Sequence, residues 1–185
     1  ARIIEWGDMQ EFYGKIANGK WQSVVLDPVG ELLDKLLTDL KKNRLFTQVQ
    51  TGALTLQAWG IAKDRMRQML KAFRDLEKHV ICVAHVQQPR QEGDLKMRPK
   101  IAANLVEELC AMMDVVGYMT SEKTENGTYE RKIWVCPTQG YYAKDRTGML
   151  PEWVEPNFEK ILAMVDGEKV RKTKAPKDQS QLKIQ

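Results

Sequence analysis

A short apolar run that ends in an acid and a proline is the feature that most constrains this fold. It covers residues 21–27, in the order WQSVVLD, and Pro28 follows it. A continuous β-branched run of this length predicts a buried parallel strand. An acid at the carboxyl end of such a strand lies where an α/β sheet opens onto its ligand crevice. Asp27 is therefore the leading site candidate, and its carboxylate suits a magnesium ion held through water.

Composition predicts one globular domain. Of the 185 residues, 43% are hydrophobic and 29% are charged, which is ordinary for a chain with a real core. We assign residues 1–166 to this core and residues 167–185 to a polar, lysine-rich tail that we expect to be disordered. The net charge of +4 permits an anionic partner without requiring one, because the excess is concentrated in the tail.

Cysteine usage and hydropathy indicate a cytoplasmic protein. Cys82, Cys110 and Cys136 form no CxxC pair, so we expect reduced thiols rather than a zinc site. No apolar stretch reaches the roughly 20 residues that a membrane helix needs. The first residues also lack the pattern of a secretory signal.

The periodicity of apolar residues predicts an α/β fold with a mostly parallel sheet flanked by helices. The expected strands cover residues 3–5, 21–27, 79–84, 114–120 and 129–136, and the expected helices cover residues 9–17, 28–41, 56–77, 101–113 and 157–165. Asn126 and Gly127 predict a hairpin between the last two strands, which would add an antiparallel edge to the sheet. Residues 87–100 lack periodicity, so we expect a mobile loop there.

Three motifs in this order resemble the RecA-like core of phage nucleotide-binding ATPases used in single-strand annealing and recombination. They are SVVLD at residues 23–27, VAH at residues 83–85 and KDRTG at residues 144–148, and the resemblance spans residues 3–150. It implies a RecA-like P-loop NTPase core that binds ATP and Mg²⁺ at the strand ends. It also implies a homo-oligomeric ring or filament in which neighbouring subunits complete each site.

The resemblance assigns roles to residues near the strand ends. Asp27 corresponds to the Walker B acid on the magnesium side. His85, with Gln87, stands where a polar sensor contacts the γ-phosphate and reports it to the following loop. Glu5, on the strand expected before the Walker B strand, is a weaker candidate for polarising the attacking water.

The KDRTG motif resembles the basic fingers that reach into a neighbouring subunit's nucleotide. Lys144 and Arg146 would then offset charge on the transferring phosphoryl group. The motif departs from the KNRFG element of RadA-type proteins at Asp145 and Thr147. Pro28 also stands where RecA-like proteins often carry a serine.

The predicted loop occupies the position of the second DNA-binding loop of RecA-like proteins. Its candidate contacts to single-stranded DNA are Gln88, Arg90, Lys96, Arg98 and Lys100. Cationic side chains suit phosphate contacts, but the loop has no aromatic residue for base stacking.

The usual phosphate loop, GxxxxGK[ST], is absent from the 185 residues. Backbone amides and a lysine of that loop normally supply most phosphate binding. Two explanations stay open at this point. Either the loop lies upstream of Ala1, which we favour because the chain starts without methionine, or the protein is a degenerate, non-hydrolysing member of the family.

Each motif also has a plainer interpretation. Asp27 would serve equally as a helix N-terminal cap beside Pro28, and His85 as a structural hydrogen-bonding residue. The basic loop could be a solvated surface, and Lys144 and Arg146 could pair with surface acids.

Together these patterns predict an ATP-dependent recombination or single-strand annealing protein that couples ATP hydrolysis to single-stranded DNA binding. A single-strand-binding protein is a further expected partner, and no membrane is. The alternatives are a non-hydrolysing DNA-binding scaffold and a helicase or packaging motor subunit.

Overall fold

The computed structural model describes residues 2–88, 96–101 and 103–167 as a mixed α/β fold. The helices are α1 (Asp8–Ala17), α2 (Val29–Lys41), the short 3₁₀ helix η1 (Arg44–Phe46), α3 (Leu56–Arg74), α4 (Ala103–Met112) and α5 (Phe158–Val165). The strands are β1 (Ser23–Leu26), β2 (His79–Cys82), β3 (Val86–Gln87), β4 (Arg98–Pro99), β5 (Val115–Val116), β6 (Tyr118–Lys123), β7 (Tyr129–Trp134), β8 (Lys144–Asp145) and β9 (Trp153–Val154).

The core forms where α1 to α4 pack against one face of the β1–β2 pair. Helix α2 shows why, because its buried residues recur at helical spacing and form one apolar stripe. They are Val29, Leu32, Leu33, Leu36 and Leu40. Alternate residues of β1, Val24 and Leu26, face the same cluster.

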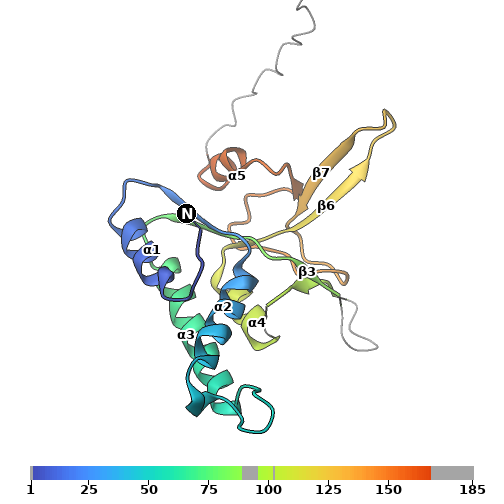
Figure 1. Cartoon of the computed structure of the whole chain (residues 1–185). Helices are drawn as coiled ribbons and strands as arrows, with labels where there is room; N and C mark the ends of the chain where they lie inside the picture. The colour runs from blue at the N-terminus through green and yellow to red at the C-terminus, as the bar shows by residue number, and fades with distance from the viewer. Residues whose placement is uncertain (1, 89–95, 102, 168–185) are drawn as a thin grey trace, which may run out of the picture.

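The helices divide unequally between the two faces of this pair. Figure 1 shows α1, α2, α3 and α4 together below the strands, with α5 above them. Helix α5 touches β2, where the Phe158 ring meets the His79 ring edge-on with 5.9 Å between centroids. On the α5 side Val25 keeps 51% of its surface exposed, so this face is only partly covered.

The parallel pairing predicted for the two apolar runs is confirmed. Strand β1 pairs with β2 in parallel, with Ser23 opposite His79 and Leu26 opposite Cys82. The wider parallel sheet is not found, because within the described residues this sheet has two strands. The predicted hairpin is confirmed at β6 and β7, but it pairs with β9 in a separate sheet rather than extending β1 and β2. Gly127 supplies the turn with φ 80°.

Several predicted boundaries need correction. Residues 3–5 form no strand, so the expected strand before α1 was wrong. Helix α3 ends at Arg74 rather than at residue 77, and α2 starts at Val29 with Pro28 as its N-cap rather than as its first helical residue. The five predicted helices are otherwise present. Helices α1 to α4 each bury apolar residues in the core, whereas α5 has no fully buried residue.

The segment predicted as a loop at residues 87–100 has structured ends. Strands β3 and β4 pair there antiparallel, with Val86 opposite Pro99 and Gln87 opposite Arg98. Arg90, within residues 89–95, lies outside the described residues, as does the predicted tail beyond Gly167. Among the helices that the structure describes, none is long and apolar enough to cross a membrane.

The buried stripe of α2 should dominate stability. Leu36 is fully buried, so Leu36→Ala should lower the free energy of unfolding by about 2–5 kcal/mol through lost burial and a residual cavity. Leu56→Ala is the matched control, since Leu56 is 91% exposed in α3 and should change stability by less than about 0.5 kcal/mol. Urea denaturation measures both, and equal effects would contradict this account of the core.

Candidate functional site

The carboxyl ends of β1 and β2 form one edge, and Asp27 lies on it. The backbone N–H of Val83 donates to the Leu26 carbonyl at 2.9 Å, and that of Val29 donates to the Val83 carbonyl at 2.8 Å. These bonds hold the residues after both strands together. Asp27 is exposed, and the N-cap of α2 is Pro28 with no side-chain capping bond, so the structure does not support a capping role for Asp27.

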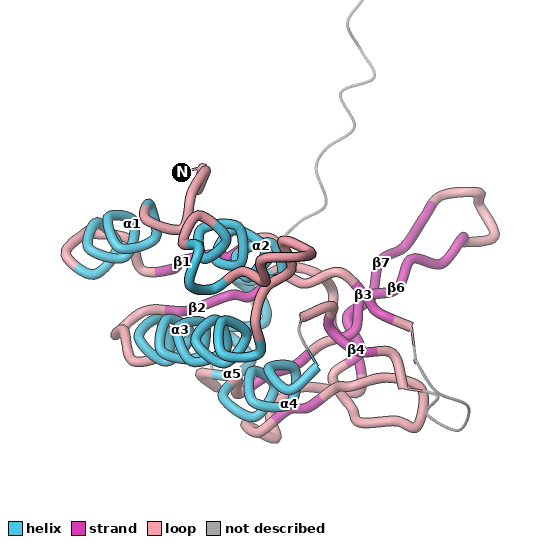
Figure 2. Tube along the Cα trace, turned by 60° about the horizontal axis from the view of Figure 1, so that its bottom comes forward, coloured by secondary structure: helices cyan, strands magenta, loops and turns pink. Residues whose placement is uncertain are grey.

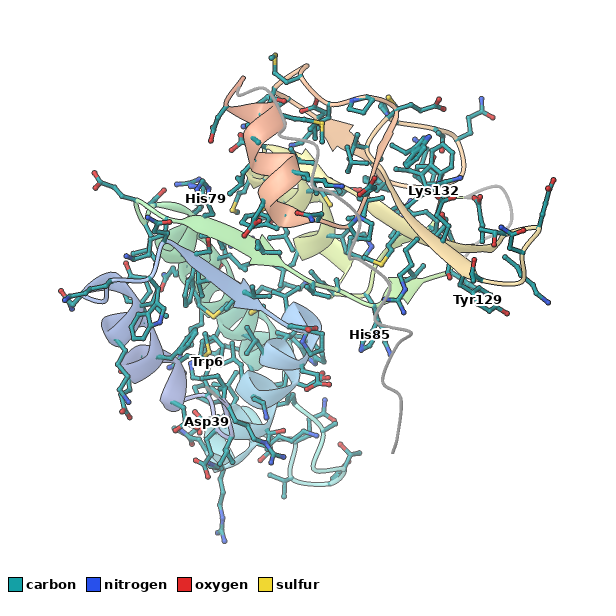
Figure 3. The ribbon with its side chains drawn as sticks, turned by 90° about the horizontal axis from the view of Figure 1, so that it is seen from above. Trp6, Asp39, His79, His85, Tyr129 and Lys132 are labelled. Atoms are coloured by element: carbon teal, nitrogen blue, oxygen red, sulfur yellow. The ribbon has the colours of Figure 1, made fainter. Side chains whose placement is uncertain are left out.

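The chain continues along this edge from β2 to His85, which is labelled in Figure 3. The His85 side chain is exposed. The backbone carbonyl of His85 accepts a 2.7 Å bond from the backbone N–H of Lys100. Gln87 follows on β3 opposite Arg98. Main-chain pairing therefore joins the two candidate sensor residues to two basic residues of the predicted loop: His85 to Lys100, and Gln87 to Arg98.

Glu5 lies elsewhere. Its carboxylate bonds the Lys42 ammonium at 3.0 Å, and Lys42 is the C-cap of α2. Asp27 precedes the other end of this 13-residue helix, so about 20 Å of helix separates the two acids. The structure does not bring Glu5 to the Asp27 edge.

Lys144 and Arg146 both bind the C-terminal end of α4. The Lys144 ammonium donates to the Cys110 carbonyl at 2.6 Å, and the Arg146 guanidinium donates to the Ala111 carbonyl at 2.7 Å. Cations at this end also complement the helix dipole. Burial, together with the charge of Arg146, holds the pKa of Lys144 below its ordinary value.

The two side chains differ in what else they reach. Arg146 keeps 56% of its side chain exposed and pairs with Asp114 at 3.1 Å. It also lines an open hollow of about 380 Å³ between α3 and α4, together with Lys71, Arg74 and Glu108. Arg146 is therefore the cation of the KDRTG motif that faces solvent.

Asp145, between the two cations, organises the turn that presents them. Its carboxylate accepts bonds from the Thr147 hydroxyl at 2.6 Å, the Thr147 N–H at 2.9 Å and the Leu150 N–H at 3.0 Å. Burial disfavours the charged form, but the bonds from Thr147, Leu150 and Gly148 outweigh it, so the pKa of Asp145 lies below its ordinary value. The side chain that departs from the asparagine of RadA-type motifs therefore has a structural role.

A bidentate ion pair between Arg67 and Glu108 joins α3 to α4. The Arg67 guanidinium bonds both carboxylate oxygens of Glu108, one of them at 2.7 Å. This pairing lowers the pKa of Glu108 and raises that of Arg67. It holds α4, and with it the two cations, against α3.

One aromatic ring far along the sequence from the basic loop, that of Tyr142, lies beside the loop in the fold. The Lys96 ammonium and the Arg98 guanidinium stand 5.7 Å and 5.4 Å from the centre of the Tyr142 ring. The N–H of Met97 donates to the Gly140 carbonyl, and that of Tyr142 donates to the Met97 carbonyl. Sequence reasoning missed Tyr142 because it counted only rings within the loop.

A second hollow lies at the opposite end of the strands. It measures about 590 Å³ and is lined by residues before β1 and at the start of β2, among them Trp21, Lys78 and His79. Ligands of open α/β sheets bind at the carboxyl ends instead, so we do not assign the site there.

The described residues show neither a preformed cluster of metal ligands nor an activated thiol at Cys82. No group of three or more His, Cys, Asp or Glu side chains gathers around a metal position in the part of the chain that the structure describes. Cys82, on β2, has its pKa raised to about 11 by burial, so it is an inert core thiol.

The bonds to Asp145 should contribute stability that depends on pH. Asp145→Asn should lower the free energy of unfolding at pH 7 by about 1 kcal/mol. Because folding lowers the pKa of Asp145 below 3.8, the wild-type advantage should be full above that pH and vanish as the pH falls through the folded value. Urea denaturation at pH 7 and pH 2.5 measures it, with Glu125→Gln at the exposed hairpin turn as control; a pH-independent difference would contradict this assignment.

Comparison with known proteins identifies the family. A family model described as AAA domain matches residues 1–147. Searches of curated proteins and of solved structures each found no match. The matched region covers the β1–β2 edge, His85 and the cations on α4. The chain belongs to this family of AAA-type P-loop ATPases.

Proposed function

We propose that this protein binds ATP with magnesium and uses its hydrolysis in single-strand annealing or recombination of DNA. The observation that carries the proposal is the shared edge of β1 and β2, where Asp27 follows one strand and the His85 segment follows the other. In open α/β sheets ligands bind at such an edge. Family membership supports nucleotide binding there.

The residues at the edge fit a magnesium ion in the manner typical of nucleotide sites. Such ions use one or two carboxylates and complete their shell with water and phosphate oxygens. Asp27 is exposed and has no capping bond, so its carboxylate is accessible for this role. Bound ATP and magnesium would supply the phosphoryl group and part of the charge compensation. The 185 residues contain no GxxxxGK[ST] loop.

In this proposal Arg146 acts as the finger toward a neighbouring subunit's nucleotide. Its exposed guanidinium, with Lys71 and Arg74 on the same hollow, gives a positive surface suited to a phosphate group. Lys144 instead positions the turn, because its ammonium donates hydrogen bonds to the Cys110 and Ala111 carbonyls of α4. Assembly into a ring or filament would bring this surface to a second subunit.

Single-stranded DNA is the proposed second ligand. The backbone N–H of Lys100 bonds the His85 carbonyl, and Arg98 lies opposite Gln87. Lys96 and Arg98 both contact the ring of Tyr142, an aromatic side chain suited to base stacking. The main-chain bond between His85 and Lys100 provides a short route by which nucleotide state could alter this surface. A single-strand-binding protein is a natural partner of such an activity.

The experiment that tests the proposal measures magnesium-dependent ATP binding and hydrolysis by the full-length protein, with and without single-stranded DNA. DNA-stimulated turnover is expected. DNA binding with no turnover would favour a non-hydrolysing scaffold, and directional strand displacement would favour a helicase or packaging motor.

Asp27 should be essential for the magnesium-dependent part of nucleotide binding. Asp27→Asn should weaken magnesium affinity in the presence of ATP by roughly 10- to 100-fold, because it removes the charge that orients the ion's water shell. Titration calorimetry measures the loss. Asp34→Asn, at an exposed position of α2, is the control and should bind as the wild type does. Equal affinities for both variants would remove Asp27 from the site.

Arg146 should be needed for hydrolysis rather than for nucleotide binding. Arg146→Ala should lower the turnover rate by about a thousandfold or more while sparing most ATP affinity. Asp114→Asn is the control, because it removes the ion partner of Arg146 and keeps the guanidinium. A melting curve for each variant separates a catalytic loss from loosening of α4. Normal hydrolysis by Arg146→Ala would rule out the finger assignment.

A further inference from the structure

The β6–β7 hairpin is an arm with two chemically different faces. Figure 1 shows it projecting away from the helices. Residues opposite each other in an antiparallel pair share a face. One face, here called the acidic face, carries Tyr118, Thr120, Glu122, Glu130, Lys132 and Trp134; the other, here called the cationic face, carries Met119, Ser121, Lys123, Tyr129, Arg131 and Ile133.

The charged residues of the acidic face pair with one another. The Lys132 ammonium lies 3.1 Å from a Glu122 carboxylate oxygen and 3.4 Å from one of Glu130. It also stands 4.9 Å from the centre of the Trp153 ring on β9. These acids raise the pKa of Lys132, whose ammonium lies between the two carboxylates. With two acids and one base, the acidic face keeps a net negative charge and offers no unpaired cation to an anionic partner.

The cationic face is open to solvent. Tyr129 is 70% exposed and Met119 is 54% exposed. Lys123 and Arg131 are exposed as well, and neither has an ion pair among the residues that the structure describes. Figure 3 shows Tyr129 and Lys132 on opposite sides of the arm. The arm carries three acids and three bases in all, so the register, and not net charge, creates this face.

We infer that the cationic face binds single-stranded nucleic acid. Lys123 lies directly opposite Tyr129, and Arg131 follows on the same face about 7 Å along β7. An aromatic ring flanked by two cations suits an unpaired base whose neighbouring phosphates need compensation. A strand of phosphates is also the charge complement of a surface without acids. This inference rests on the proposed DNA-binding function and adds a second contact surface to it.

The test measures binding of a fluorescent oligothymidylate to the full-length protein by anisotropy, over a range of salt concentrations. Tyr129→Ala should weaken binding by about 5- to 100-fold, whereas Tyr129→Phe should keep wild-type affinity because it keeps the ring. The double variant Lys123→Ala with Arg131→Ala should reduce the slope of log affinity against log salt by about 1.4, as expected for two lost phosphate contacts. The charge-matched control is Lys20→Ala with Lys41→Ala; both residues are exposed, Lys20 before β1 and Lys41 at the end of α2.

The outcomes distinguish failure of the inference about the cationic face from failure of the proposed DNA-binding function. If the wild type binds the oligonucleotide and the arm variants bind as tightly as the control, the arm inference is overturned while DNA binding stands. If the wild type hydrolyses ATP but never binds the oligonucleotide, both the inference about the cationic face and the proposed annealing function are overturned. The ATPase activity would still stand. Sedimentation of each variant provides the last check: loss of affinity only in step with loss of the oligomer would assign the face to contacts between copies.

Discussion

The parallel pairing of β1 and β2 is the interaction on which the rest of this structure depends. It aligns two chain segments 56 positions apart, with Ser23 opposite His79, and so brings the residues after both strands to one edge. Burial of Val24 and Leu26 against the helices anchors one strand of the pair. Without this pairing Asp27 would be an isolated acid between a strand and a helix.

Short main-chain connections lead from that edge to the other features of interest. The His85 carbonyl accepts a bond from the Lys100 N–H, and Met97, just before β4, bonds the segment that carries Tyr142. Two residues later the chain reaches Lys144, whose ammonium binds the end of α4. Figure 2 shows β3 and β4 on the same side of the molecule as the β6–β7 arm. The β1–β2 edge is therefore joined to the proposed DNA-binding surface by a short series of main-chain bonds.

The three charged residues of the KDRTG turn have different structural roles. Asp145 holds the turn through bonds to Thr147 and Leu150, and Lys144 ties it to α4. Arg146 is left with an exposed guanidinium on a positive hollow. Because a rigid support reduces the entropy lost on reaching a ligand, this division favours Arg146 as the functional cation.

The sequence by itself determined the five α-helices, the two parallel strands, the hairpin and the position of Asp27 directly after β1. The stripe of α2, the parallel runs of β1 and β2, and the Gly127 hairpin were all predictable, because each depends on periodicity or turn chemistry within a short segment. Only the tertiary structure decided that Glu5 pairs with Lys42 rather than approaching Asp27. It likewise decided that Tyr142 lies beside the basic loop and that the hairpin joins β9 instead of the parallel pair. These are contacts between segments far apart in the chain, which depend on packing and charge pairing that no local pattern encodes.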